Sequence, residues 1–266
     1  MMPSADTRAA EKDPQFAYTL SRGLDVLRAF DGSMAELGNR EIAKRTGIAR
    51  STVARLTRTL AMLGYLQYDA DRARYRMGAA LLTLAYPLLA QLPIRQIARP
   101  LLQKLANLAH GSVSLAMNQG AHMVLIESCV GPDAVTRPDI GATRELVSTS
   151  LGLAYLAGSD ESKRSALLSQ VLPNSVVPDA VPRSTLLACI MQEINRYQKS
   201  GFCVAPHGPG SLLAVAVPVR APNGELMAIN CAVALHLADA QRMELEIGPR
   251  LVGLARDLEN LLGTAT

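Results

Sequence analysis

Basic and short polar side chains gather at the start of one predicted helix. Arg50, Ser51 and Thr52 open it, and Arg55 follows one turn later. A helix that enters the major groove of DNA needs such side chains near its N-terminus, because these are the ones that reach base edges. We therefore expect Arg55 to read bases, with Arg50, Ser51 and Thr52 beside it. Ser51 has an alternative role as a helix cap.

Further arginines surround this helix in the sequence. We expect Arg22, Arg40 and Arg58 to contact phosphates. Two more, Arg72 and Arg74, lie in a predicted hairpin, where they would reach the DNA backbone or the minor groove. Arg76 belongs to the same hairpin but has a structural alternative, in which it packs beside Met77.

The distribution of charge supports this reading. The 266-residue chain has a formal net charge of +4, and residues 1–90 hold 13 Lys and Arg against 9 Asp and Glu, whereas the rest of the chain is balanced at 14 against 14. Between Arg40 and Arg76 the ratio is nine to three. Such a cluster is typical of a phosphate-binding surface, although a solvated basic face gives the same count.

The elements that would carry these residues follow from apolar spacing and turn residues. A first helix starts near Ser21 and ends at Asp31-Gly32, and Asn39 caps a second one. Gly47 supplies the turn into the helix Arg50–Leu63, which has one apolar stripe and is followed by two short strands. The stripe consists of Val53, Leu56, Leu60 and Leu63. Three helices and a hairpin predict a winged helix-turn-helix module.

The rest of the chain predicts a helical connector and a mixed domain. Residues 79–92 are mostly apolar and are interrupted by Pro87, and a helix is expected over 94–110. Strands follow near 113–117, 123–126, 212–220 and 226–234, helices near 151–157, 161–171 and 184–199, and a last helix over 238–262. We assign 1–15 as a disordered tail, 16–78 as the DNA-binding domain, 79–93 as the linker and 94–266 as a second domain.

From Tyr18 onward the sequence resembles the IclR family of bacterial transcriptional regulators. The resemblance is carried by four motifs in order: Ser21-Arg22-Gly23-Leu24-Asp25-Val26-Leu27, Glu41-Ile42-Ala43-Lys44-Arg45-Thr46-Gly47-Ile48, Arg50-Ser51-Thr52-Val53-Ala54-Arg55-Leu56 and Leu63-Gly64-Tyr65-Leu66. It implies an α+β chain in which the winged module is joined to a GAF-like effector-binding domain. It also implies binding to double-stranded operator DNA as a homodimer or homotetramer.

Weaker matches in the second half imply a ligand pocket. These are Leu146 to Gly152, Tyr197 to Phe202 and Ala214 to Val219. By resemblance the pocket is lined near Ser150, Leu151, Ala205, Ala214, Asn230 and Ala232. The chain departs from the common family pattern at Val147 and at Ala205-Pro206-His207, so the ligand of relatives does not transfer. Fewer charged groups favour a more apolar small organic acid, for example an aromatic one.

Two other functions are considered. A hydrolase or transferase could use Cys203 or Cys231 with His207, but no nucleophile motif surrounds either cysteine. A DNA-binding protein whose large domain only oligomerises would need no pocket, and the sequence does not separate it from a ligand sensor.

The cysteines, the histidines and the apolar runs of the sequence bear on cofactors, metal sites and cellular location. The four cysteines lie far apart and His110, His122 and His236 are isolated, so no metal site or other cofactor is predicted. No signal peptide and no apolar run long enough for a membrane span is found, so we expect a cytoplasmic protein without membrane partners.

Overall fold

The computed structural model describes residues 13–30, 35–174, 183–205 and 212–264. The chain divides into two compact units between Gln91 and Leu92, which lies within the linker predicted at 79–93. The predicted tail lies largely outside the described residues, as does the predicted turn Asp31-Gly32. Among the helices described, none is both long and apolar enough to cross a membrane.

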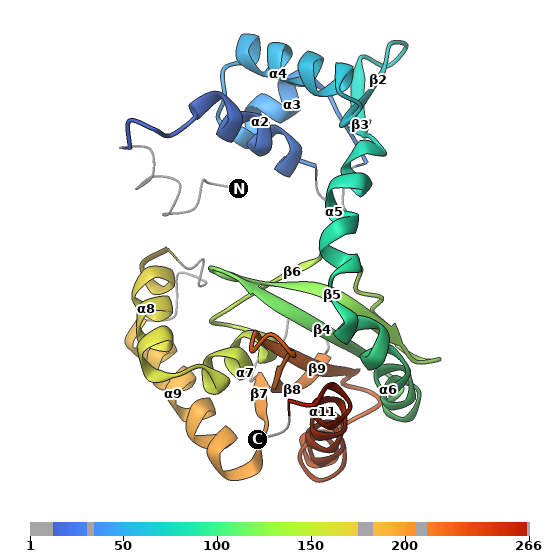
Figure 1. Cartoon of the computed structure of the whole chain (residues 1–266), viewed down its shortest axis with the longest axis vertical. Helices are drawn as coiled ribbons and strands as arrows, with labels where there is room; N and C mark the ends of the chain where they lie inside the picture. The colour runs from blue at the N-terminus through green and yellow to red at the C-terminus, as the bar shows by residue number, and fades with distance from the viewer. Residues whose placement is uncertain (1–12, 31–34, 175–182, 206–211, 265–266) are drawn as a thin grey trace. The chain divides into compact units, whose positions relative to one another are not determined.

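The first unit is a three-helix module with a small antiparallel sheet in the order β1-β3-β2 (Figure 1). Its elements in chain order are α2 (Tyr18–Arg28), β1 (Glu36–Leu37), α3 (Asn39–Thr46), α4 (Arg50–Met62), β2 (Leu66–Asp69) and β3 (Arg74–Met77). Its core is formed by aliphatic side chains from all three helices and the sheet, among them Val26, Leu37, Ile42, Val53 and Leu66. The predicted winged helix-turn-helix is confirmed.

Three details of this unit differ from the sequence-based expectations. Gly38, not Asn39, precedes α3, and its N–H donates to Glu41 Oε2 at 2.7 Å. Asn39 instead accepts a hydrogen bond from the buried Thr57 hydroxyl at 3.0 Å, which ties α3 to α4. Leu63 is exposed rather than part of the packed stripe, because α4 ends at Met62. Strand β1 was not predicted, since two residues show no periodicity.

Helix α5 (Ala80–Ala90) follows the wing and has no buried residue. It continues through Pro87, although proline cannot donate to the carbonyl one turn earlier. Leu82 is 73% exposed and Tyr86 is 70% exposed. Residues 78–94 contain no charged side chain. An isolated helix of this composition leaves a large apolar surface in water.

The second unit is built on a six-stranded antiparallel sheet in the order β6-β5-β4-β9-β8-β7. The strands are β4 (Ser112–Gln119), β5 (His122–Val130), β6 (Thr143–Glu145), β7 (Cys203–Ala205), β8 (Leu212–Arg220) and β9 (Leu226–Ala234). The helices are α6 (Pro93–Ala109), α7 (Ser150–Gly158), α8 (Glu161–Val171), η1 (Leu172–Asn174), α9 (Arg183–Ser200), α10 (Ala240–Arg242), η2 (Met243–Ile247) and α11 (Gly248–Leu262). Strands and helices together confirm the predicted α+β class.

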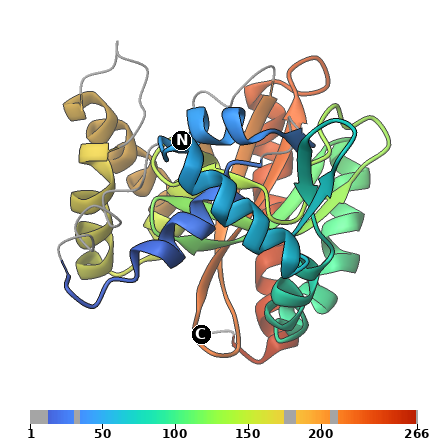
Figure 2. The same cartoon turned by 90° about the horizontal axis from the view of Figure 1, so that it is seen from above.

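Helices cover both faces of this sheet, and Figures 1 and 2 both separate α8 and α9 from α6 and α11. Alternate residues of a strand face opposite sides, so the two faces have different cores. Val113, Val215 and Ile229 pack with α6 and α11. Ala116, Ala216 and Ala228 pack with α7 and α9. We call this second side the α7 face.

A buried charge ties α6 to β5. The Glu127 side chain is 4% exposed and pairs with Arg95 at 3.2 Å and with Arg99 at 2.7 Å. Arg95 also donates from Nε to the main-chain oxygen of Ile126 at 2.6 Å. These contacts fix the first two turns of the helix that follows the unit boundary.

The end of the second unit differs from the single helix predicted over 238–262. A short α10 is followed by a π-helical segment, η2, before α11 begins at Gly248. The backbone approaches closely here: a Cβ added at Gly248 would lie 2.6 Å from the Phe202 ring. The short strands β6 and β7 were also not predicted, because three residues carry too little pattern.

Candidate nucleic-acid interface and ligand site

Helix α4 presents a basic, polar surface on one side and packs on the other. Gly47 ends α3 in the left-handed region with φ 72°, and Ala49, with φ −55° and ψ 136°, immediately precedes α4. Val53 and Thr57 are fully buried, whereas Arg50, Ser51, Arg55 and Arg58 are exposed and Thr52 is half-buried. The packing of Val53 and Thr57 therefore fixes which residues face outward.

The structure bears on the alternative role of Ser51. Ala49 precedes α4 and provides no side-chain hydrogen bond, so the helix start is not capped by a side chain. Ser51 lies inside the first turn with an exposed side chain. Its hydroxyl can therefore contact a ligand. Arg22 on α2 and Arg40 on α3 are exposed as well.

The hairpin arginines already have partners within the first unit. Arg72 pairs with Glu36 at 3.5 Å and with Asp69 at 4.0 Å. Arg74 donates to Glu41 at 3.1 Å and to the main-chain oxygen of Glu36 at 3.1 Å. These contacts brace β3 against β1 and α3, and they give Arg74 a structural role that the sequence did not indicate.

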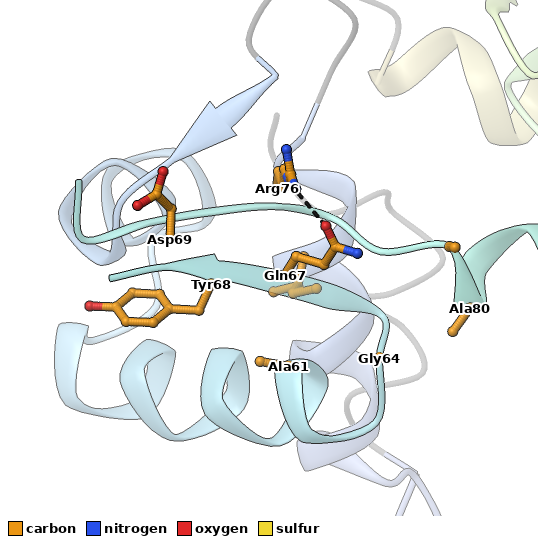
Figure 3. A pocket seen from close by; sticks show the side chains of 9 residues that line it. Ala61, Gly64, Gln67, Tyr68, Asp69, Arg76 and Ala80 are labelled. Atoms are coloured by element: carbon orange, nitrogen blue, oxygen red, sulfur yellow. Dashed lines mark hydrogen bonds between the residues drawn. The ribbon is translucent and has the colours of Figure 1, made fainter. Parts of the chain in front are cut away.

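Arg76 crosses the hairpin to Gln67, whose Oε1 accepts from Nε at 2.9 Å (Figure 3). Beside this pair lies an open hollow of about 740 Å³, bounded by the end of α4, the hairpin and the start of α5. Its lining combines small, polar and apolar residues: Ala61, Gly64, Leu66, Gln67, Tyr68, Asp69, Arg76, Ala79 and Ala80. This hollow is in the first unit and is distinct from the predicted ligand site.

Most residues predicted to bind a ligand meet on the α7 face. Ala205, Ala214, Ala232 and Ser112 are cross-strand neighbours on β7, β8, β9 and β4. Asn230 is two residues before Ala232 on β9, so both lie on the same face. Ala214, Asn230 and Ala232 are half-buried. The side chain of Ala205 and all of Pro206 and His207 lie outside what the structure describes.

Ser150 and Leu151 lie in the first turn of α7, which contacts β8 and β9. Both are buried, and Leu151 belongs to the same core cluster as Ala216 and Ala228. The predicted set therefore combines two buried residues with three half-buried ones. Ser114 and Ser128 lie on the same face and were not predicted, although the alternation of Ser112, Ser114 and Ala116 in β4 placed Ser114 there.

Cys203 and Cys231 lack the properties of a nucleophilic cysteine. Burial raises the pKa of the Cys203 thiol to about 12, and it raises the pKa of Cys231 to about 12 as well. A nucleophilic cysteine needs a lowered pKa and access to solvent. Within the described ranges, no group of three or more His, Cys, Asp or Glu side chains is arranged to hold a metal ion.

A winged module with an exposed basic recognition helix, joined to a larger α+β unit, defines a class of DNA-binding transcriptional regulators. Comparisons with known proteins agree. Residues 19–70 match the IclR helix-turn-helix domain, and residues 87–259 match the bacterial transcriptional regulator IclR C-terminal domain. The chain belongs to the IclR family of bacterial transcriptional regulators, and its relatives are regulators rather than enzymes.

Individual relatives cover nearly the whole chain. The HTH-type transcriptional regulator TsaQ1/TsaQ2 of Comamonas testosteroni is 28% identical over 94% of this chain and 90% of its own length. The Pca regulon regulatory protein of Pseudomonas putida is 28% identical, with 96% and 88% covered. A solved IclR family regulator from Brucella abortus is 32% identical with a TM-score of 0.80 and covers 95% of both chains.

Proposed function

We propose that the chain binds operator DNA as a homodimer or homotetramer and that a small organic acid on the α7 face controls this binding. The observation that carries the DNA-binding part is the orientation of α4. Buried Val53 and Thr57 leave Arg50, Ser51 and Arg55 facing outward at its N-terminal half. A helix used in this way reads bases from its first turns.

Arg55 is the residue proposed to read a base, and Arg58 in the same helix is the matched control. On an operator selected from random-sequence DNA, Arg55→Ala should weaken binding by about 1 to 3 kcal/mol and leave binding to scrambled DNA less affected. Arg58→Ala, proposed to contact a phosphate, should weaken both equally. Gel-shift titrations measure all four losses. Equal losses on both DNAs for Arg55→Ala would assign Arg55 to the backbone.

Helix α5 supports the proposed oligomer. None of its residues is buried, and it combines exposed leucines with Tyr86 in a stretch that has no charge. Exposed apolar patches of this kind are typical of protein–protein contacts. One recognition helix also reads too few base pairs for specificity in a genome, so a two-fold arrangement on paired half-sites is expected.

Sedimentation and footprinting test the oligomer. Leu84→Glu with Leu88→Glu places charge on one side of α5 and should shift the protein toward monomer, whereas Gln91→Glu at the exposed end of the helix should not. Footprints of the unchanged protein should show paired protections on related half-sites. A single unpaired protection at stoichiometric protein contradicts the dimer.

The α7 face is proposed as the effector site because half-buried small residues meet there on adjacent strands. An aromatic acid is the first class to test. A solved IclR homologue from Microbacterium hydrocarbonoxydans, 23% identical, is complexed with 4-hydroxybenzoate, and a relative in Acinetobacter baylyi, 23% identical, is a p-hydroxybenzoate hydroxylase transcriptional activator. Effector and operator must alter each other's affinity by the same factor, typically about 5- to 150-fold.

A thermal-shift screen of carboxylic acids tests this part. The best acid is then measured by calorimetry on Ala214→Leu and Ala232→Leu, which should fill the site and weaken binding. Ala166→Leu on the exposed surface of α8 is the control. Unchanged affinity in both folded variants would place the ligand elsewhere. If no compound class stabilises the protein, a domain that serves oligomerisation only becomes the better account.

A further inference from the structure

A row of cross-strand neighbours on the α7 face contains three polar residues, on β5, β4 and β9, and ends at an alanine on β8. Ser128 on β5 faces Ser114 on β4, Ser114 faces Asn230 on β9, and Asn230 faces Ala216 on β8. The hydroxyls of Ser114 and Ser128 lie 3.2 Å apart and form one hydrogen bond. The amide oxygen of Asn230 is buried and has no hydrogen-bond partner among the described residues. Asn230 is therefore the residue in this row whose hydrogen bonding is incomplete.

An unsatisfied buried amide oxygen is unusual. Most buried polar atoms in native structures have a partner, and each exception calls for an explanation. The strand neighbours of Asn230 cannot provide one, because Ala228, Ala232 and Ala216 have no side-chain donor. The Ser114 hydroxyl already contacts Ser128. A molecule bound to this face can supply the donor for Asn230 Oδ1 that the described residues do not.

We propose that the effector presents an uncharged hydroxyl to Asn230 Oδ1, and that the protein selects hydroxylated acids over their parent acids for this reason. This inference rests on the proposed effector site. The amide oxygen accepts hydrogen bonds and does not donate them, so a carboxylate does not satisfy it. An ammonium group is a poorer match, because no side chain in the row from Ser128 to Ala216 is ionisable. The carboxylate of the ligand therefore does not bind to this oxygen.

The expected selectivity follows from the cost of leaving this oxygen unpaired. A parent acid that fills the site shields Asn230 from water without supplying a donor. The penalty for an unsatisfied buried acceptor corresponds to roughly 5- to 150-fold in affinity. A site built to bond a hydroxyl discriminates against the analogue without one more strongly than an apolar pocket discriminates by size.

Calorimetry on the full chain with matched acids tests the proposal. The probes are benzoate with its 2-, 3- and 4-hydroxy derivatives, and propanoate with lactate. The quantity measured is the affinity ratio of hydroxylated to parent acid, because the contribution of the carboxylate cancels in that ratio. At least one hydroxylated acid should bind at least fivefold more tightly than its parent. Equal affinities across both series overturn the proposal.

Three variants locate the selectivity. Asn230→Leu removes the acceptor and should bring the ratio close to one, whereas Asn230→Asp keeps an acceptor oxygen and should retain the preference. Asn260→Leu, at an exposed position on α11, should leave the ratio unchanged. A preference that persists in Asn230→Leu overturns the proposal, and so does one lost in Asn230→Asp. If none of the benzoate and propanoate probes binds, while other acids that carry no hydroxyl group do bind, only this inference fails. If no acid of any kind binds, the proposed effector class fails and the inference with it.

Discussion

Removal of Arg95 or of Arg99 should affect stability very differently, although both pair with Glu127. Distance alone favours Arg99, whose contact is 2.7 Å against 3.2 Å for Arg95. Burial favours Arg95, because its side chain is 18% exposed and that of Arg99 is 61% exposed. Water and salt screen an exposed pair, so we expect burial to decide.

The magnitudes follow from these environments. Arg99→Ala should cost about 1 kcal/mol at most, as for surface ion pairs. Arg95→Ala removes a buried pair and the bond to Ile126, and should cost about 3 kcal/mol. In a unit of this size each kcal/mol shifts the melting temperature by about 2 to 4 °C, so Arg95→Ala should lower it by about 6 to 12 °C.

Differential scanning calorimetry of the full chain measures both losses. The comparison should be repeated at high salt, where the small effect of Arg99→Ala should shrink further and that of Arg95→Ala should persist. The loss in the double variant should differ from the sum of the two, since both arginines act on one carboxylate. Equal losses for the two single variants, or a larger loss for Arg99→Ala, would refute the argument from burial.

Three further predictions concern single positions. Gly152→Ala should destabilise the second unit, because the added Cβ overlaps the main-chain oxygen of Leu146. Gly253→Ala should instead stabilise α11 by about 1 kcal/mol, because no atom lies within 4 Å of the added Cβ and alanine favours a helix more than glycine does. Chemical denaturation measures both changes. The hydrogen bond from the Gly38 backbone N–H lowers the pKa of Glu41. The contribution of the Glu41 carboxylate to folding stability should therefore be present above the ordinary carboxylate pKa and lost as pH falls through the lowered value. When stability is measured during an acid titration, the Glu41→Gln variant should lack this pH-dependent contribution. Among the cysteines, exposed Cys189 should react with thiol reagents in the folded protein, and Cys203 should react only on unfolding.

The recognition helix could be predicted because its information is local. The spacing of Val53, Leu56 and Leu60 gives one apolar side, and Gly47 and Gly64 mark the turns around the helix. Local patterns also gave most helices and strands of the second unit. They failed where an element was short or changed its period, as in β1 and in the π-helical segment η2.

Contacts between distant residues could not be predicted. The strand predicted near 123–126 stopped short of Glu127, and the ion pairs of this buried residue are with Arg95 and Arg99, about thirty positions earlier in the chain. Asn230 was named from the family resemblance, but the lack of a partner for its amide oxygen among the described residues depends on which neighbours β4 and β8 place beside it. The sequence therefore predicted Asn230 as a site residue, but it did not predict that its amide oxygen is without a hydrogen-bond donor among the described residues.

The paired arginines of the wing bear on how DNA binding would respond to ionic strength. Each phosphate neutralised by a free cationic side chain releases condensed counterions, and affinity then falls steeply with salt. Arg72 and Arg74 are already neutralised by Glu36, Asp69 and Glu41. To reach a phosphate they must exchange one anion for another, which returns a carboxylate to solvent and to its own counterions. A wing of this kind adds little to the salt dependence, so occupancy of the operator would vary less with the ionic conditions of the cell than the number of arginines suggests.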